Sequence, residues 1–149
     1  MKIIETLPNT QDAIALMEEL SKSLEKITGN NGKSSFDPND VCVPRSLFVV
    51  AYDDNGQAIG CGAIRPLNES IAEVKRMFSK TKGSGVGSVI LDYLEKQAVR
   101  LGYSALWLET RLVNKRAVAF YEKRGYCRIP NYGKYVNRPE AVCFEKKIY

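Results

Sequence analysis

The chain has 149 residues, which is long enough for one domain, covering 1–149, with a substantial hydrophobic core. Apolar residues make up 44% of it and charged residues 26%, a balance typical of soluble globular proteins. The net charge of +5 suits an anionic ligand, but no basic cluster is dense enough to indicate nucleic acid as a partner.

Hydrophobic periodicity divides the chain into short apolar strands and helices whose apolar positions recur every three or four residues. Glycine, proline and asparagine punctuate these segments. In chain order the predicted elements are strand 2–5, helix 10–27, strands 46–52, 57–64 and 71–78, helix 86–101, strand 105–110, helix 115–124, and strands 126–129 and 142–147. This order predicts a mixed, largely antiparallel central sheet flanked by helices, in an α+β or three-layer α/β fold.

Several element boundaries have a local cause. Asn9 or Thr10 can cap the first helix, and Asn114 can cap the third. An Asp-Asp-Asn-Gly turn joins two apolar strands into a hairpin. The polar segment 33–44 is long for a loop in a compact domain, so it is either functional or a solvated connection.

The residue types present limit the chemistry. The absence of histidine excludes Ser-His-Asp and Cys-His nucleophiles and the usual catalytic zinc ligands, so acid–base chemistry falls to Glu, Asp, Tyr, Lys or Cys. The scattered cysteines form no C-x-x-C pair, and neither a metal site nor a disulfide framework is indicated. No apolar run approaches a membrane span and the N-terminus lacks a signal-peptide core, so we expect a cytoplasmic protein with no membrane partner.

The segment from Lys82 to Ser88 is the most informative stretch of the chain. Its three glycines at alternate positions let the backbone take positive φ and expose N–H groups. The segment joins strand 71–78 to the helix that begins near Val86, and free amides at a helix N-terminus favour an anion. The spacing G-x-G-x-G matches neither a P-loop nor a dinucleotide fingerprint. It indicates either a site for another phosphate-bearing ligand or simply a tight turn.

Three motifs in this order resemble those of the GNAT superfamily of acetyl-CoA-dependent N-acetyltransferases. The family's [QR]-x-x-G-x-[GA] loop is similar to Lys82 through Gly87, with Lys in place of Gln or Arg. The strand before it carries an internal carboxylate, here Glu73, although the link from Phe78 to Gly83 is shorter than usual and lacks proline. The family's N-x-x-A-x-x-[FL]-Y-x-x-x-G-[FY] segment matches, with every spacing kept, Asn114, Ala117, Phe120, Tyr121, Gly125 and Tyr126.

The resemblance implies transfer of an acetyl group from acetyl-CoA to a primary amine of a small molecule or exposed peptide, by direct attack in a ternary complex. Amides of the glycine-rich loop would hold the CoA pyrophosphate, and the edge of the preceding strand would pair with pantetheine and polarise the thioester. Tyr121 would protonate the departing sulfur, and Glu73 would take the proton of the amine. The residues implied to bind the cofactor are Met77, Phe78, Lys82, Gly83, Ser84, Gly85, Val86, Gly87, Ser88 and Asn114.

Each assignment has an alternative. Glu73 can instead form a structural ion pair with the basic residues that follow it, and Tyr121 can be a packed core aromatic. The whole chain can instead be a catalytically idle CoA-binding regulatory domain, or a module that binds another nucleotide phosphate. In the resembled family the acceptor pocket is built by two loops, here 33–45 and 130–139, and homodimers are frequent.

Overall fold

A computed structural model describes all 149 residues, and it contains one seven-stranded sheet and three α-helices. The strands are β1 (Lys2–Thr6), β2 (Leu47–Tyr52), β3 (Ala58–Pro66), β4 (Ile71–Ser79), β5 (Ala105–Arg111), β6 (Cys127–Ile129) and β7 (Ala141–Lys147). The helices are α1 (Gln11–Thr28), α2 (Val86–Arg100), α3 (Lys115–Lys123) and the short 3₁₀ turns η1 (Lys33–Ser35), η2 (Pro38–Val41) and η3 (Gly133–Tyr135). Every predicted strand and helix is present, with ends that differ by one or two residues.

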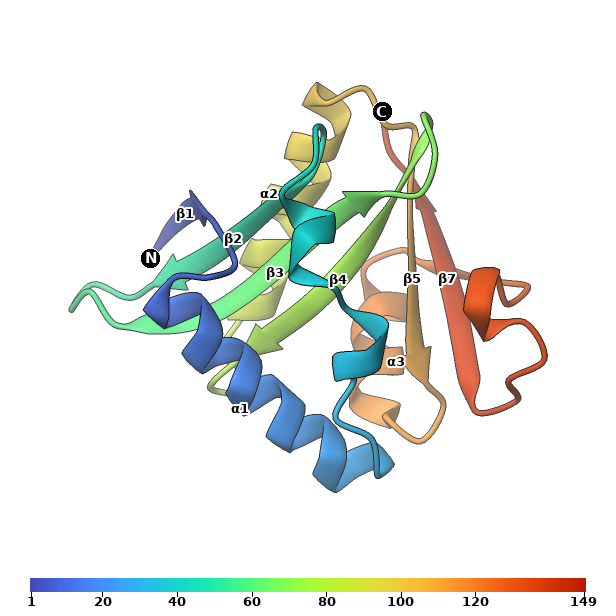
Figure 1. Cartoon of the computed structure of the whole chain (residues 1–149), viewed down its shortest axis with the longest axis horizontal. Helices are drawn as coiled ribbons and strands as arrows, with labels where there is room; N and C mark the ends of the chain where they lie inside the picture. Colours follow the sequence, from blue (N-terminus) through green and yellow to red (C-terminus); the bar gives the residue numbers. More distant parts are fainter.

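The strands lie side by side in the order β1-β2-β3-β4-β5-β7-β6 (Figure 1). All neighbouring pairs are antiparallel except β4 and β5, which are parallel. The predicted mixed, largely antiparallel sheet is therefore confirmed. The position of β7 between β5 and β6 is a long-range pairing that the local sequence pattern does not specify.

The strands β4 and β5 separate soon after they begin. They are paired only at three positions, the last of which joins Glu73 to Trp107, and beyond it the two strands diverge (Figure 1). On the other edge of β4 the register with β3 shifts, so that Arg76 and Met77 both lie opposite Gly62. This bulge holds Arg76 at a φ of 53°, in the left-handed region. The second half of β4 thus has one edge with no strand partner.

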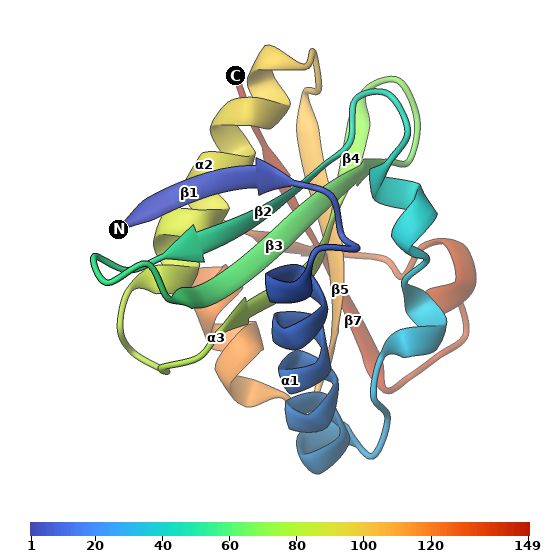
Figure 2. The ribbon, with the colours of Figure 1, turned by 60° about the vertical axis from the view of Figure 1, so that its left-hand side comes forward.

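The helices cover opposite faces of the sheet (Figure 2). On one face α1 and η2 form a core cluster of Ala13, Leu16, Leu20, Val41, Phe48, Val50, Cys61, Ala63 and Phe78. On the other face α2 and α3 pack over a larger cluster that includes Val49, Ile64, Val74, Ile90, Leu94, Leu106, Tyr121 and Phe144. The result is a three-layer arrangement with the separated strands at its centre.

Local chemistry explains where the elements begin and how closely they pack. Thr10, rather than Asn9, caps α1, because its Oγ1 accepts a hydrogen bond of 3.3 Å from the amide of Ala13. The helix α2 lies so close to β3 that a Cβ on Gly62 would be 2.8 Å from the side chain of Ile90. Only glycine permits this approach.

The remaining sequence predictions concern cysteines, metals and membranes. All four cysteines are free; Cys61 and Cys143 are buried, and Cys42 and Cys127 are exposed. No group of three or more His, Cys, Asp or Glu side chains is arranged to hold a metal ion. None of the helices combines the length and the apolar character needed to span a bilayer.

Candidate active site

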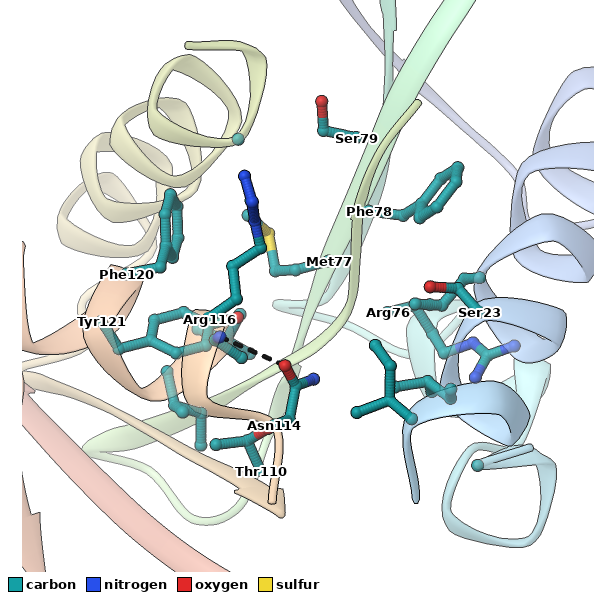
Figure 3. A pocket seen from close by; sticks show the side chains of 18 of the residues that line it. Ser23, Arg76, Met77, Phe78, Ser79, Thr110, Asn114, Arg116, Phe120 and Tyr121 are labelled. Carbon is teal, nitrogen blue, oxygen red and sulfur yellow. Dashed lines mark hydrogen bonds between the residues drawn. The ribbon is translucent and has the colours of Figure 1, made fainter. Parts of the chain in front are cut away.

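A cavity of about 470 Å³ occupies the gap between the diverging strands β4 and β5. Its lining comes from both faces of the sheet: the second half of α1 and the loop after it on one side, and the starts of α2 and α3 on the other. In Figure 3, Phe120, Tyr121 and Asn114 lie on one side, and Arg76 and Ser23 lie on the other. Two ligands that approach opposite faces of the sheet can therefore meet in one cavity.

The glycine-rich loop forms one end of this cavity. Gly83 and Gly85 have φ angles of 74° and 84°, and no atom lies within 4 Å of the position that a Cβ would take at either. Gly85 is also the N-cap of α2, and no side chain caps that helix. Because the first-turn amides of a helix have no intrahelical partner, those of α2 remain free to bind an anion.

Basic side chains surround the same end. Lys82, Arg116 and Arg124 line the cavity there. The Nζ of Lys82 lies 5.2 Å from the ring centroid of Phe78, and burial, together with Arg116, lowers the pKa of Lys82. Arg124 lies over the ring of Phe120 at 4.2 Å. Free amides and three cations, with no carboxylate among them, fit the phosphates expected for CoA.

The backbone of β4 connects this end to the centre of the cavity. Met77 and Phe78 both line it, and they lie on the strand whose edge β5 leaves unpaired. Their side chains pack on opposite faces, Phe78 in the α1 cluster and Met77 against the α2 cluster. An extended ligand could pair with such a free strand edge.

Tyr121 and Asn114 stand on the α3 side of the cavity (Figure 3). The ring of Tyr121 is buried and packs edge-on against Phe120 and Tyr126, and burial raises the pKa of its hydroxyl. Asn114 caps α3, accepting a hydrogen bond of 3.3 Å from the amide of Ala117. Tyr121 is thus both a packed aromatic and a cavity residue.

Glu73 lies outside the lining of the cavity. It is 1% exposed, and its Oε1 accepts a hydrogen bond from Arg65 Nε at 2.8 Å and forms an ion pair with Arg65 Nη2 at 2.7 Å. The hydroxyl of Tyr132 donates to the other carboxylate oxygen. The ion-pair partner of Glu73 is therefore Arg65 on β3, and both of its oxygens are engaged.

A second carboxylate, which the sequence analysis missed, does line the cavity. Glu109 lies in the second half of β5, and it pairs with Arg111 of the same strand at 3.0 Å. Burial raises the pKa of Glu109, and the charge of Arg111 opposes this shift. The signal was present in the sequence, because Glu109 is the one charge in the predicted strand 105–110, and a charge in a predicted strand is the argument that singled out Glu73.

The two loops expected to form the acceptor pocket differ in outcome. Ser35 is the one residue of 33–45 that lines the cavity, next to Gly32 just before that loop, and no residue of 130–139 lines it. The tyrosines of the second loop instead support the buried charges of β4. Tyr132 bonds to Glu73, and Tyr135 accepts a hydrogen bond of 3.3 Å from Lys75, whose pKa burial lowers.

Comparisons with known proteins identify the family. Residues 13–126 match the model of the acetyltransferase (GNAT) family. The chain is 33% identical over 142 residues to an IAA acetyltransferase of Azospirillum brasilense, covering 93% of this chain and 92% of that protein. Its match to an uncharacterized N-acetyltransferase of Schizosaccharomyces pombe, 29% identical over 86 residues, spans 56% of this chain and about half, 53%, of that protein.

Solved structures show the same fold. A Klebsiella pneumoniae protein provisionally assigned as an acyl-CoA N-acyltransferase superposes with a TM-score of 0.83 at 27% identity, over 99% of this chain and 97% of that one. An aminoglycoside 6'-N-acetyltransferase in complex with coenzyme A gives a TM-score of 0.67 at 19% identity, over 100% of this chain and 98% of that one. The chain belongs to the GNAT family of acetyltransferases, as its motifs indicated, and it is an acyltransferase.

Proposed function

We propose that this enzyme transfers an acetyl group from acetyl-CoA to a primary amine, of a small molecule or an exposed peptide, within a ternary complex. The observation that carries the proposal is the single cavity between β4 and β5, which is open to both faces of the sheet. The donor would enter from the side of α2 and α3, and the acceptor from the side of α1. Direct attack requires that both meet at one point, and the gap between the strands provides it.

Acetyl-CoA fits the α2 end of the cavity and would supply an activated acetyl thioester. The amides from Lys82 to Ser88 would bind its pyrophosphate, with Arg116 and Arg124 adding positive charge. The free edge of β4 at Met77 and Phe78 would hold the pantetheine arm and donate an N–H to the thioester oxygen. Asn114 would contact the cofactor while it caps α3.

Tyr121 would act as the acid that protonates the departing sulfur. It lines the cavity, and no protein group forms a hydrogen bond with its hydroxyl. Because burial raises its pKa, the hydroxyl keeps its proton at neutral pH and has one to donate. The surrounding ring contacts would fix its direction.

Two carboxylates compete for the role of base. Glu73 as the base is the prediction from the sequence, and it would have to act through Tyr132, because both of its oxygens are already engaged. Glu109 lines the cavity and needs no relay, and burial raises its pKa, which makes it a stronger base than an exposed carboxylate. The geometry favours Glu109.

The decisive experiment combines binding with turnover. Calorimetric titration with acetyl-CoA, CoA and ATP should show binding of both CoA compounds and none of ATP. Thiol release with a panel of primary amines should then exceed the rate without amine. CoA binding without release for any amine would identify an idle CoA-binding domain, and preferential ATP binding would identify a nucleotide module. A cytoplasmic location and a homodimer stay predictions.

A further inference from the structure

The α1 end of the cavity carries an uncompensated positive charge. Four charged side chains line it outside the glycine-rich loop and α3, namely Lys75, Arg76, Glu109 and Arg111. Glu109 and Arg111 pair with each other at 3.0 Å. Glu109 is also the one carboxylate in the whole lining. Lys75 has the buried Glu73 nearby, whereas Arg76 has only the more distant charge of Glu18 and no carboxylate within ion-pair distance.

Arg76 is fixed in place but only partly engaged. Its Nη2 donates hydrogen bonds to the carbonyl of Met17 at 3.1 Å and to Ser21 Oγ at 2.7 Å, both on α1. Its guanidinium carbon lies 5.6 Å from the ring centroid of Phe36. No carboxylate lies within ion-pair distance of it, and Nη1 makes no hydrogen bond. Its Nε is the one buried side-chain polar atom of the protein without a partner.

Burying the guanidinium of Arg76 with free donors costs free energy unless another group pairs with it. A guanidinium removed from water loses solvation, and here burial lowers the pKa of Arg76, which the charge of Glu18, beyond ion-pair distance, offsets only in part. The bulge of β4 holds its backbone in the left-handed region, which an arginine rarely adopts. A planar fork with free donors is the preferred partner of a carboxylate.

We propose that the acceptor amine carries a carboxylate, as an amino acid does, and that this carboxylate pairs with Arg76. The inference rests on the proposed function and names the class of acceptor for it. In Figure 3, Arg76 lies across the cavity from Tyr121, so an acceptor held by Arg76 would present its amine toward the centre. Polycationic amines fit poorly, because Glu109 alone could balance their charge.

Arg76 could instead serve only to join β4 to α1. That function uses Nη2 alone, since both bonds to α1 come from this nitrogen. It does not account for the unpartnered Nε and Nη1. The experiment must therefore separate loss of a carboxylate contact from loss of a structural contact.

The test uses the full chain, acetyl-CoA and matched pairs of acceptors. Each pair consists of an amino acid and its primary amide, with an increasing number of carbons between amine and carboxylate across the series. The wild type should prefer the acid in at least one pair. Arg76→Gln should lower kcat/KM for that acid at least about tenfold more than for its amide, as expected for a charge-assisted contact. The ratio between variants cancels the difference in basicity between acid and amide.

Ser21→Ala is the matched control, because it removes one hydrogen bond between α1 and Arg76 and keeps the charge of Arg76. It should change acid and amide equally. A wild type that acetylates amines without preferring any acid would overturn the inference, and this readout needs no variant to fold. Equal losses for acid and amide in Arg76→Gln would also overturn it, by reducing Arg76 to a structural role. If no amine is acetylated while acetyl-CoA binds, the proposed function fails as well.

Discussion

The two ends of the cavity are built in different ways. The lining of the α2 end consists of backbone amides of consecutive residues and of cations from α3 and the residue after it. The lining of the α1 end consists of side chains from segments far apart in the sequence, such as Arg76 on β4 and Glu109 on β5. One end of the cavity is therefore formed by a local backbone pattern, whereas the other depends on how distant strands are placed.

Breaking the backbone pattern should have the largest effect. Gly85→Asp adds a carboxylate in open space beside the free amides, where the pyrophosphate would bind, and it strains a residue at a φ of 84°. Calorimetry should detect no acetyl-CoA binding. Gly56→Asp is the control, because it places the same side chain at a φ of 78° in the β2–β3 turn, also in open space. Binding by folded Gly85→Asp with wild-type affinity would refute the assignment of this end.

The next largest effect is a loss of kcat on substitution of Tyr121, which lies between the two ends of the cavity. Tyr121→Phe keeps the ring contacts and removes the proton donor, so kcat should fall by about 10² to 10⁴ with acetyl-CoA affinity nearly unchanged. Tyr126→Phe is the matched control, since its hydroxyl bonds to Glu95 at 2.9 Å and does not line the cavity. A kcat that stays unchanged in Tyr121→Phe, where chemistry limits the rate, would leave this residue a packing role only.

Glu109 and Glu73 should respond differently to pH. Glu109→Gln should lower kcat/KM roughly 10²-fold at neutral pH, and the loss should shrink as pH rises and free amine becomes plentiful. Below neutral pH the pKa of Glu109, which burial raises above its ordinary value of 4.5, has the opposite effect on the comparison. Wild-type activity should therefore rise with pH through that raised pKa, and the variant should lack this rise. A pH–rate profile with one amine measures both.

Glu73→Gln supplies the contrast. It removes the charge that Arg65 faces across β3 and β4, so it should lower the melting temperature. Its loss of activity should be equal at every pH if Glu73 only positions its neighbours. A pH-dependent loss in Glu73→Gln, with a parallel profile in Glu109→Gln, would assign the base to Glu73 as the sequence suggested.

The sequence predicted local features of the molecule and missed those that depend on pairing between distant strands. The caps at Thr10 and Asn114, the helical apolar faces and the glycine-rich loop are local features, and they were predicted because neighbouring residues determine them. The separation of β4 and β5 was not, because it depends on pairing between distant segments. The adjacent charges Lys75 and Arg76 in a central strand did break the alternation, and in retrospect they mark the bulge.

The smallest effect is expected at Lys82, and it tests whether the α2 end binds phosphate mainly through its backbone amides. Lys82 lines the cavity in a loop whose amides lack partners, and its side chain is partly exposed and screened by solvent. Lys82→Gln should therefore raise the Kd of acetyl-CoA only about two- to fivefold and reduce its dependence on salt. Lys80→Gln is the control in the same loop, because Lys80 pairs with Glu19 at 3.5 Å and lies outside the cavity. A loss as large as that of Gly85→Asp would mean that side-chain charge, rather than the amides, dominates phosphate binding here.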